Sequence, residues 1–227
     1  MCGRFTLTLD PGELQQLLNL GPFVHIVQPR YNIAPSQPVP IVKDLATKAV
    51  ELYKWGLVPF WADDPNIGYK MINARSETVT EKPSFRAAFK YRRCLILADG
   101  FFEWHAEKKD EAKTPYYFKM THDQPFTFAG LYEHWEPPEG GELHTCTILT
   151  CGPNELVSRY HDRMPVILGE VVRWAWLDPE AKEKELLEFL TSYPAEQMKC
   201  HAVSREVNSP KVDHPEMLQP VSPQDLS

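Results

Sequence analysis

Five candidate β segments follow one another closely in the middle of the chain, and this spacing restricts the fold more than any other feature. They are short, rich in Val, Ile, Phe, Tyr and Thr, and lie at 93–98, 100–105, 115–120, 126–132 and 143–150. Parallel neighbours need a crossover of a dozen or more residues, usually a helix, and these gaps leave little room for one. We therefore expect a single α+β domain with a mostly antiparallel, barrel-like sheet flanked by short helices.

The remaining segments fit the same class. Further strands are expected at 39–43, 48–54 and 200–204, with short helices from Asp10-Pro11, after Pro83, and at 153–160, 169–176 and 181–190. The four prolines in 29–40 predict an extended loop there, and 55–80 follows no clean period. No repeat or linker divides the chain, so 1–227 is expected to be one domain that ends in a Pro-rich tail at 211–227.

Composition excludes several classes of protein. Hydrophobic residues make up 43% and charged residues 24% of the 227 residues, as in ordinary globular proteins rather than disordered chains. No apolar run approaches the roughly 20 residues of a membrane helix, and no leader with a charged and then an apolar segment opens the chain. The five cysteines are scattered without a C-x-x-C pair, which disfavours a disulfide scaffold or a zinc module and fits a reducing cytoplasm. We expect a cytoplasmic monomer with no metal and no cofactor.

The net charge of -7 seems to oppose a nucleic-acid partner, but the charge is uneven. Residues 54–93 hold eight Lys/Arg and four Asp/Glu, so this stretch carries +4 and the rest -11. A phosphate backbone meets local charge, so a basic face on an acidic protein is possible. From charge alone, an ordinary solvated surface is the favoured interpretation.

The chain begins Met1-Cys2-Gly3-Arg4, and removal of Met1 would leave an N-terminal cysteine. Such a residue carries an α-amine and a thiol on adjacent carbons, with pKa values of ~7.7–8.0 and ~8.5. An aldehyde could form a Schiff base with the amine, and the thiol could then close a five-membered thiazolidine ring. Cys2 could instead be a small apolar residue in an early strand, or the nucleophile of an N-terminal-nucleophile hydrolase. Position alone does not separate these alternatives.

Three further polar residues lie among apolar neighbours, where they need partners. Asn73 lies in MINARSET (71–78), Glu103 lies between aromatic residues in ADGFFEW (98–104), and His161 opens HDRMPVIL (161–168). A carboxylate among aromatics tends to have a raised pKa and can act as a general acid or base, and a loop histidine can carry protons. An exposed glutamate at a strand end and a structural histidine are the alternatives. The other seven histidines lie in no motif.

The pair Phe60-Trp61 follows Pro59 in WGLVPFWA (55–62). Exposed loop aromatics beside arginine stack on the bases of single-stranded nucleic acid, at ~1–3 kcal/mol per base. Core packing is the alternative for at least one of the two rings.

Taken together, these segments resemble one family. The motifs MCGRF, RYNIAPSQ (30–37), WGLVPFWA, MINARSET, ADGFFEW, HDRMPVIL and VSREVNSP (203–210) follow the order and spacing of the SOS response-associated peptidase (SRAP) family, from residue 2 to about 210. Seven ordered motifs, one of them necessarily N-terminal, are far more specific than any one alone. The resemblance implies a sensor and shield of abasic sites in single-stranded DNA, in which mature Cys2 forms a reversible thiazolidine crosslink with the ring-opened sugar aldehyde.

The resemblance also implies roles for residues. Cys2 looks like the crosslinking nucleophile, Asn73 like the group that orients the amine and the sugar, Glu103 like the acid/base group, and His161 like a second proton carrier. Arg4, Arg75 and Arg163 look like phosphate contacts, with Lys82 and Arg86 as further backbone contacts. The wedge and stacking surface around a kinked strand is expected at Asn32, Pro35, Phe60 and Trp61.

Two other functions stay open. The family name implies a peptidase, so an N-terminal-nucleophile cysteine hydrolase built on Cys2, Asn73 and Glu103 is the first alternative, with removal of the residue before Cys2 as its simplest reaction. The second is a single-strand-binding module without catalysis, in which Cys2 is only structural.

Overall fold

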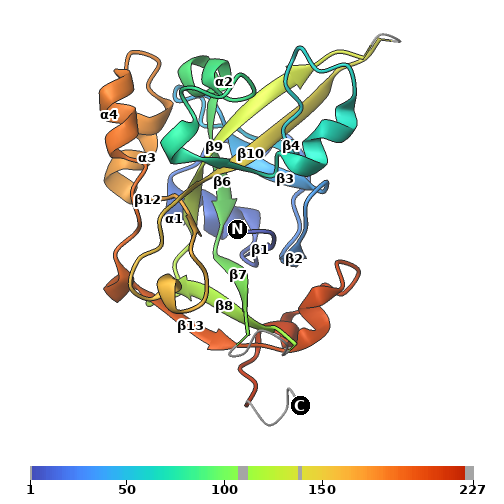
Figure 1. Cartoon of the computed structure of the whole chain (residues 1–227), viewed down its shortest axis with the longest axis vertical. Coiled ribbons are helices and arrows are strands. Elements are labelled where there is room, and N and C mark those ends of the chain that lie inside the picture. The colour runs from blue at the N-terminus through green and yellow to red at the C-terminus, as the bar shows by residue number, and fades with distance from the viewer. Residues whose placement is uncertain (1, 107–111, 138–139, 223–227) are drawn as a thin grey trace.

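A computed structural model describes residues 2–106, 112–137 and 140–222 and contains two sheets (Figure 1). The smaller sheet is antiparallel throughout. Its strand order is β13 (Met198–Ala202), β8 (Thr114–Met120), β7 (Gly100–His105), β1 (Phe5–Leu7) and β2 (Arg30–Ile33).

The larger sheet closes on itself. Its order is β11 (Met164–Pro165), β10 (Leu143–Cys151), β4 (Val50–Trp55), β3 (Pro38–Val42), β6 (Arg93–Ala98), β9 (Phe126–Trp135) and β12 (Ile167–Leu168), with β5 (Asn73–Arg75) also on β10. Because β9 also pairs with β10, the strands β10, β4, β3, β6 and β9 form a closed barrel. Among the strands of the described residues, only the pairings of β10 with β4 and with β5 are parallel, and one isolated parallel bridge joins Phe23 to Val50. The predicted α+β fold with a mostly antiparallel, barrel-like sheet is confirmed.

Four short helices lie outside the strands: α1 (Pro11–Leu18), α2 (Arg86–Tyr91), α3 (Glu170–Leu177) and α4 (Glu183–Glu188). The Asp10 carboxylate accepts hydrogen bonds from the Gly12 and Glu13 amides, which fixes the start of α1 as the Asp-Pro pair predicts. No helix of the described ranges is both long and apolar enough to cross a membrane.

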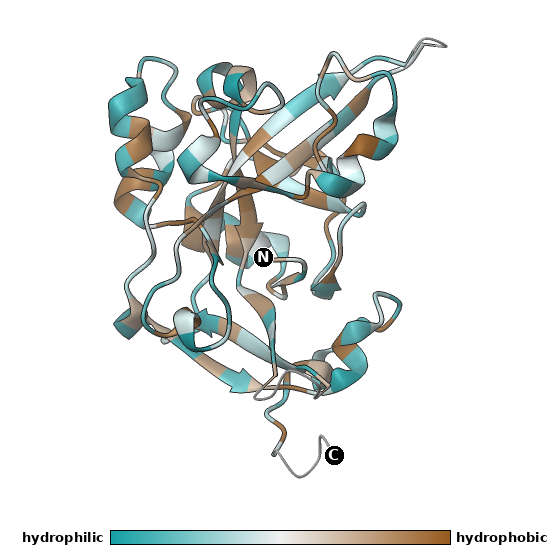
Figure 2. Ribbon diagram, viewed as in Figure 1, coloured by the Kyte–Doolittle hydropathy of each residue, from teal (hydrophilic) through white to brown (hydrophobic). Residues whose placement is uncertain are grey.

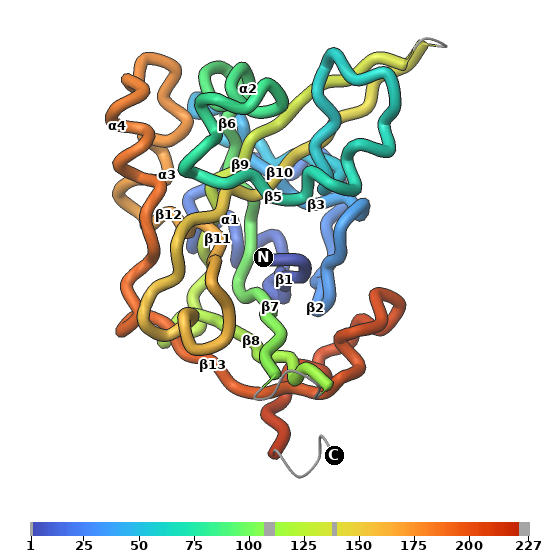
Figure 3. The backbone as a smooth tube through the Cα atoms, in the orientation of Figure 1, coloured from blue at the N-terminus to red at the C-terminus, as the bar shows by residue number. Residues whose placement is uncertain are grey.

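Hydrophobic residues concentrate on the central strands (Figure 2). Phe5 of β1 lies edge-on to Trp55 of β4, at 5.1 Å between ring centroids, and to Phe128 of β9, at 5.7 Å. Phe101 of β7 is fully buried in this core, whereas Phe102 and Trp104 pack into a second cluster with Val203 and Met217. Successive residues of β7 therefore point to opposite faces of the sheet. β1 is an inner strand of the smaller sheet, between β7 and β2, and its Phe5 packs into the main core. The start of the chain therefore lies in the middle of the molecule (Figure 3).

Two expectations about local structure were wrong. Residues 29–40 contain β2 and the start of β3, because Pro38 and Pro40 pair with β4 on one side, at positions where β6 does not yet pair on the other. The expected helix at 153–160 contains one 3-10 turn, Val157–Arg159. Here the Asn154 side chain accepts from the Val157 amide and donates to the Tyr193 carbonyl, which fixes a tight turn in place of a longer helix.

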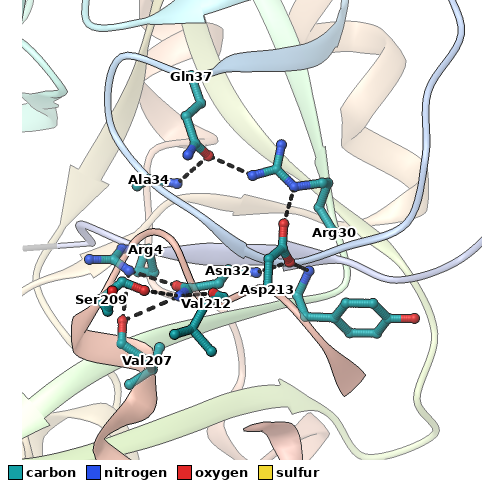
Figure 4. Close-up of polar contacts among 10 residues, drawn as sticks. Arg4, Arg30, Asn32, Ala34, Gln37, Val207, Ser209, Val212 and Asp213 are labelled. Carbon is teal, nitrogen blue, oxygen red and sulfur yellow. Dashed lines mark hydrogen bonds and ion pairs between the residues drawn. The ribbon is translucent and has the colours of Figure 1, made fainter. Parts of the chain in front are cut away.

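The last part of the chain packs against the fold up to the end of the described residues. Met217 in the 3-10 turn Pro215–Leu218 is fully buried, and Asp213 accepts from the Tyr31 and Asn32 amides at 2.6 and 3.1 Å. Asp213 also pairs with Arg30 (Figure 4). The segment that composition describes as a Pro-rich tail thus covers one end of β2.

Candidate active site at the start of the chain

Pairing of β1 with β7 places Cys2. Phe5 lies opposite Phe101, and the Phe102 amide donates to the Arg4 carbonyl at 3.0 Å. The same carbonyl lies 3.7 Å from Sγ of Cys2, whose side chain is fully buried. The first residues of the chain are therefore held beside β7.

Asn73 reaches Cys2 from the barrel. It lies on β5, which pairs in parallel with β10 so that Asn73 is opposite Ile148. Its Nδ2 donates to the Cys2 carbonyl at 2.8 Å, whereas its Oδ1 is buried without a hydrogen-bond partner. An unused buried acceptor is costly, so this oxygen is available for a donor that arrives at the site, such as an amine or a sugar hydroxyl.

Glu103 and His161 form a second pair of residues near Cys2. Glu103 lies on β7 with its side chain 2% exposed, and Nε2 of His161 lies 3.9 Å from its Oε2. The other ring nitrogen of His161, Nδ1, lies 2.9 Å from the Asp162 carboxylate and accepts from the Arg163 amide at 3.0 Å. The four residues expected to carry chemistry, Cys2, Asn73, Glu103 and His161, thus lie in one cluster.

The electrostatics of this cluster favour proton transfer. Burial raises the pKa of Glu103 to about 7, and burial lowers the pKa of His161. Burial, with the nearby charge of Glu103, raises the pKa of the Cys2 thiol well above its usual range, so the sulfur is held as a neutral thiol. A neutral thiol needs a base in order to attack, and a carboxyl with a pKa near 7 can take and return a proton at neutral pH.

Two of the expected DNA contacts, Arg4 and Asn32, hydrogen-bond to each other and to the segment 207–212 (Figure 4). Asn32 is fully buried; its Oδ1 accepts from Nη1 of Arg4 at 2.7 Å, and its Nδ2 donates to the carbonyls of Ser209 and Val212 at 3.0 and 2.7 Å. Arg4 also donates to the Val207 carbonyl at 2.7 Å. In this structure Asn32 presents no exposed atom to a ligand, so its contacts fix the position of the segment 207–212.

Arg163 is held by a carboxylate. Its Nη1 and Nη2 lie 2.5 and 2.9 Å from the two carboxylate oxygens of Glu77, and Nη2 also donates to the Thr150 carbonyl at 2.6 Å. These hydrogen bonds from Arg163 lower the pKa of Glu77. A phosphate that approached Arg163 would have to displace Glu77.

The other expected contacts lie on the surface. Phe60 and Trp61 are 60% and 47% exposed, so neither ring is part of the core. Arg75, Lys82 and Arg86 are exposed, and Pro35 is half-buried in the turn after β2. These side chains are accessible to a nucleic acid without any rearrangement of the core.

Two residues were missed by sequence reasoning. Glu77 lies within MINARSET, two positions after Arg75, but only the fold shows that it faces Arg163 rather than Arg75. Asp213 lies beyond the last recognisable motif, and its contacts with β2 span more than 180 positions of sequence. No local pattern indicates either pairing.

The family model for SOS response associated peptidase (SRAP) matches residues 1–210. Because that match covers most of the chain, the protein belongs to the SRAP family. It is 44% identical to abasic site processing protein YoqW of Bacillus subtilis, over 96% of this chain and 99% of that protein. It is 35% identical to abasic site processing protein HMCES of Xenopus tropicalis, over 96% of this chain and 78% of that protein.

Solved structures show the same fold. A protein from Bacteroides thetaiotaomicron superposes with a TM-score of 0.87 at 26% identity and covers 97% of this chain and 100% of its own. A phage-related protein from Bordetella bronchiseptica superposes with a TM-score of 0.69 at 28% identity, over 90% of this chain and 95% of its own.

The raised pKa of Glu103 predicts a specific dependence of stability on pH. The carboxyl binds its proton more tightly in the folded chain (pKa about 7) than at its ordinary value of 4.5, so stability falls as pH rises through this window. The loss is on the order of 3 kcal/mol, and Glu103→Gln should remove it. Urea unfolding at pH 5 and pH 8 measures the difference. The exposed Glu155→Gln variant should follow the wild type, and parallel profiles for wild type and Glu103→Gln would contradict the assignment.

Proposed function

We propose that this protein recognises abasic sites in single-stranded DNA and captures them covalently on Cys2 once Met1 has been removed. The cluster of Cys2 with an orienting amide, a carboxyl of pKa near 7 and a histidine carries the proposal. The names of the relatives support the substrate class, since YoqW and HMCES are both called abasic site processing proteins.

The chemistry follows from the two nucleophiles of an N-terminal cysteine. The α-amine attacks C1′ of the ring-opened sugar aldehyde, and one water leaves as the imine forms. The Cys2 sulfur then adds to the imine carbon while its proton moves to the nitrogen, which closes a thiazolidine ring. A simple imine at this carbon promotes β-elimination and strand breakage, so ring closure protects the DNA strand.

The neighbouring groups serve these proton movements. Glu103, with its pKa near 7, takes the proton of the amine or thiol and returns it to the departing oxygen. His161, with Nε2 at 3.9 Å from Oε2 of Glu103, serves as a second proton carrier. Asn73 orients the first residue through the Cys2 carbonyl, and its free Oδ1 accepts from the incoming amine or sugar. The reverse reaction uses the same groups in opposite protonation states, so the crosslink is reversible.

The surface around the cluster supports a preference for single strands. We propose that the exposed Phe60 and Trp61, together with Pro35, serve as an apolar wedge for unstacked bases, while the exposed Arg75, Arg86 and Lys82 offer positive charge. In this proposal Arg4 and Arg163 also contact phosphates, and Arg163 does so once the phosphate has displaced Glu77. Asn32 acts through the segment that it anchors rather than by touching DNA. We propose that a cytoplasmic monomer does this work and joins the nucleoid when bound to DNA.

The proposal explains the word peptidase in the family name without a separate peptide substrate. Removal of Met1 is required, and it follows either from the Cys2 thiol with Glu103 as base or from a housekeeping aminopeptidase. Both routes give the same mature N-terminus, so DNA capture does not depend on which one acts.

A denaturing gel with an abasic single-stranded oligonucleotide tests this function. Wild type should give a shifted covalent band, and Cys2→Ala should give none while it still binds DNA, because alanine keeps the amine but lacks the sulfur that closes the ring, and an open imine is hydrolysed. Cys200→Ala, which alters the one cysteine that is not buried, should crosslink like wild type. A band from Cys2→Ala, or full crosslinking by a chain with a blocked N-terminus, would contradict the mechanism. Peptide turnover without a band would indicate the hydrolase, and salt-sensitive binding alone would indicate a binding module.

The ion pair between Glu77 and Arg163 predicts a gain of affinity. In Glu77→Gln the arginine no longer faces a charged competitor, so an intact single-stranded oligonucleotide should bind roughly two- to five-fold more tightly at low salt. The salt slope should steepen by about one unit. Fluorescence anisotropy measures both. Glu81→Gln removes the same charge from an exposed position without such a pair and is the matched control. Equal effects of the two variants would show that only bulk charge matters.

A further inference from the structure

Two histidines and one glutamate converge at the outer end of the hairpin formed by β9 and β10. His134 and His144 lie directly opposite each other on the two strands, with ring centroids 4.4 Å apart. Glu142 lies between them, with Oε1 at 2.5 Å from Nδ1 of His134 and Oε2 at 2.9 Å from Nε2 of His144. Among the described residues this is the one group of three or more His, Cys, Asp or Glu side chains whose ligand atoms all lie within 4.8 Å of one another.

Neighbouring residues hold both imidazoles in place. The Tyr53 hydroxyl lies 3.2 Å from Nε2 of His134, and the Tyr53 ring stacks on His144 at 5.0 Å between centroids and 24° between planes. Lys43 donates to the Tyr53 hydroxyl at 2.9 Å, which fixes that oxygen beside Nε2 of His134. Nδ1 is therefore the His134 nitrogen that faces Glu142, and in the metal-free chain it donates to this carboxylate, which can only accept. The charge of Lys43 is itself paired with Glu51 at 3.0 Å.

One atom of the group has no satisfactory partner. Nε2 of His144 is buried and makes no hydrogen bond, although the Glu142 carboxylate lies 2.9 Å away. The contact therefore has the distance but not the direction of a hydrogen bond. A buried nitrogen left this way is costly in the protein alone, and an additional ligand at this point would satisfy it.

We propose that His134, Glu142 and His144 bind a divalent transition-metal ion, with zinc as the best match. Two imidazoles and one carboxylate are a common protein ligand set for zinc, with a fourth position open to water, and a second hydrogen bond on a ligating histidine is the usual supporting feature. Tetrahedral bonds of about 2.1 Å place ligand atoms about 3.4 Å apart. Because Glu142 is exposed, its carboxylate can widen the present spacings of 2.5 and 2.9 Å to about that distance without moving either strand.

The metal would act on structure rather than on the thiazolidine chemistry. His144 lies four residues along β10 from Ile148, the partner of Asn73, which is about 13 Å of extended strand. Trp135 and Thr145 directly follow His134 and His144 in the sequence and lie on the opposite face of the hairpin. They hydrogen-bond to the loop that contains Phe60 and Trp61. Nε1 of Trp135 donates to the Ala62 carbonyl at 2.7 Å, and the Val58 amide donates to Oγ1 of Thr145 at 2.9 Å. An ion that ties β9 to β10 therefore steadies the platform under that loop.

Isothermal titration of the metal-free full chain with zinc chloride tests the site, in a Cys2→Ala background so that the N-terminal thiol cannot bind the ion. We expect one equivalent with a dissociation constant in the micromolar range or tighter, and at least ten-fold weaker binding in His144→Ala and in Glu142→Gln. Glu142 is exposed, so its variant keeps the fold. His214→Ala removes a histidine that faces two carboxylates without a second imidazole, and it should bind zinc like the parent. No binding in the micromolar range, or unchanged binding in His144→Ala and Glu142→Gln, would overturn the proposal.

Discussion

Backbone pairing of β1 with β7 is the interaction on which the candidate site depends. The ends of a chain are ordinarily its least ordered part, yet an N-terminal nucleophile must be held in place. Here Thr6 lies opposite Gly100, and a Cβ at Gly100 would come within 2.3 Å of the Tyr117 ring. The Tyr117 hydroxyl in turn lies 3.0 Å from Oγ1 of Thr6. Glycine at this position lets Tyr117 lie against β1, and Cys2 is fixed three residues before the paired segment.

The charge of the protein serves local recognition rather than general attraction to DNA. A net charge of -7 opposes long-range attraction, while Arg75 and Arg86 remain exposed and Arg163 is paired with Glu77. In the proposed function, this ion pair lowers the affinity for undamaged strands, because a phosphate would have to replace the Glu77 carboxylate at Arg163. Covalent capture at Cys2 then supplies the long residence time that electrostatics does not.

Sequence reasoning succeeded where the pattern was local. The strands at 93–98 and 100–105 have the predicted bounds, because a continuous apolar run at 94–98, the aromatic residues of 101–104 and the intervening Asp99 specify them within a dozen residues. Closure of the barrel was not derivable in the same way, since the parallel pairs of β10 with β4 and β5 join segments about 75 to 90 residues apart. The ordered motifs predicted that the four residues of the candidate site belong together: Cys2, Asn73, Glu103 and His161. The sequence did not indicate the ion pair of Glu77 with Arg163. It also did not indicate the contact of His134 with His144, because only the folded chain brings these side chains together. The helix expected at 153–160 failed because the side-chain hydrogen bonds of Asn154 favour a turn.

The central claim is that one residue supplies both atoms that join the protein to the abasic sugar. Intact mass spectrometry of the crosslink, with and without borohydride, tests it most directly. The account predicts a protein that lacks Met1, an adduct mass equal to protein plus abasic oligonucleotide minus one water, and no gain of two hydrogens on reduction, because ring closure has consumed the imine. An adduct that borohydride traps fully by adding two hydrogens, or one formed on a chain that retains Met1, would contradict it.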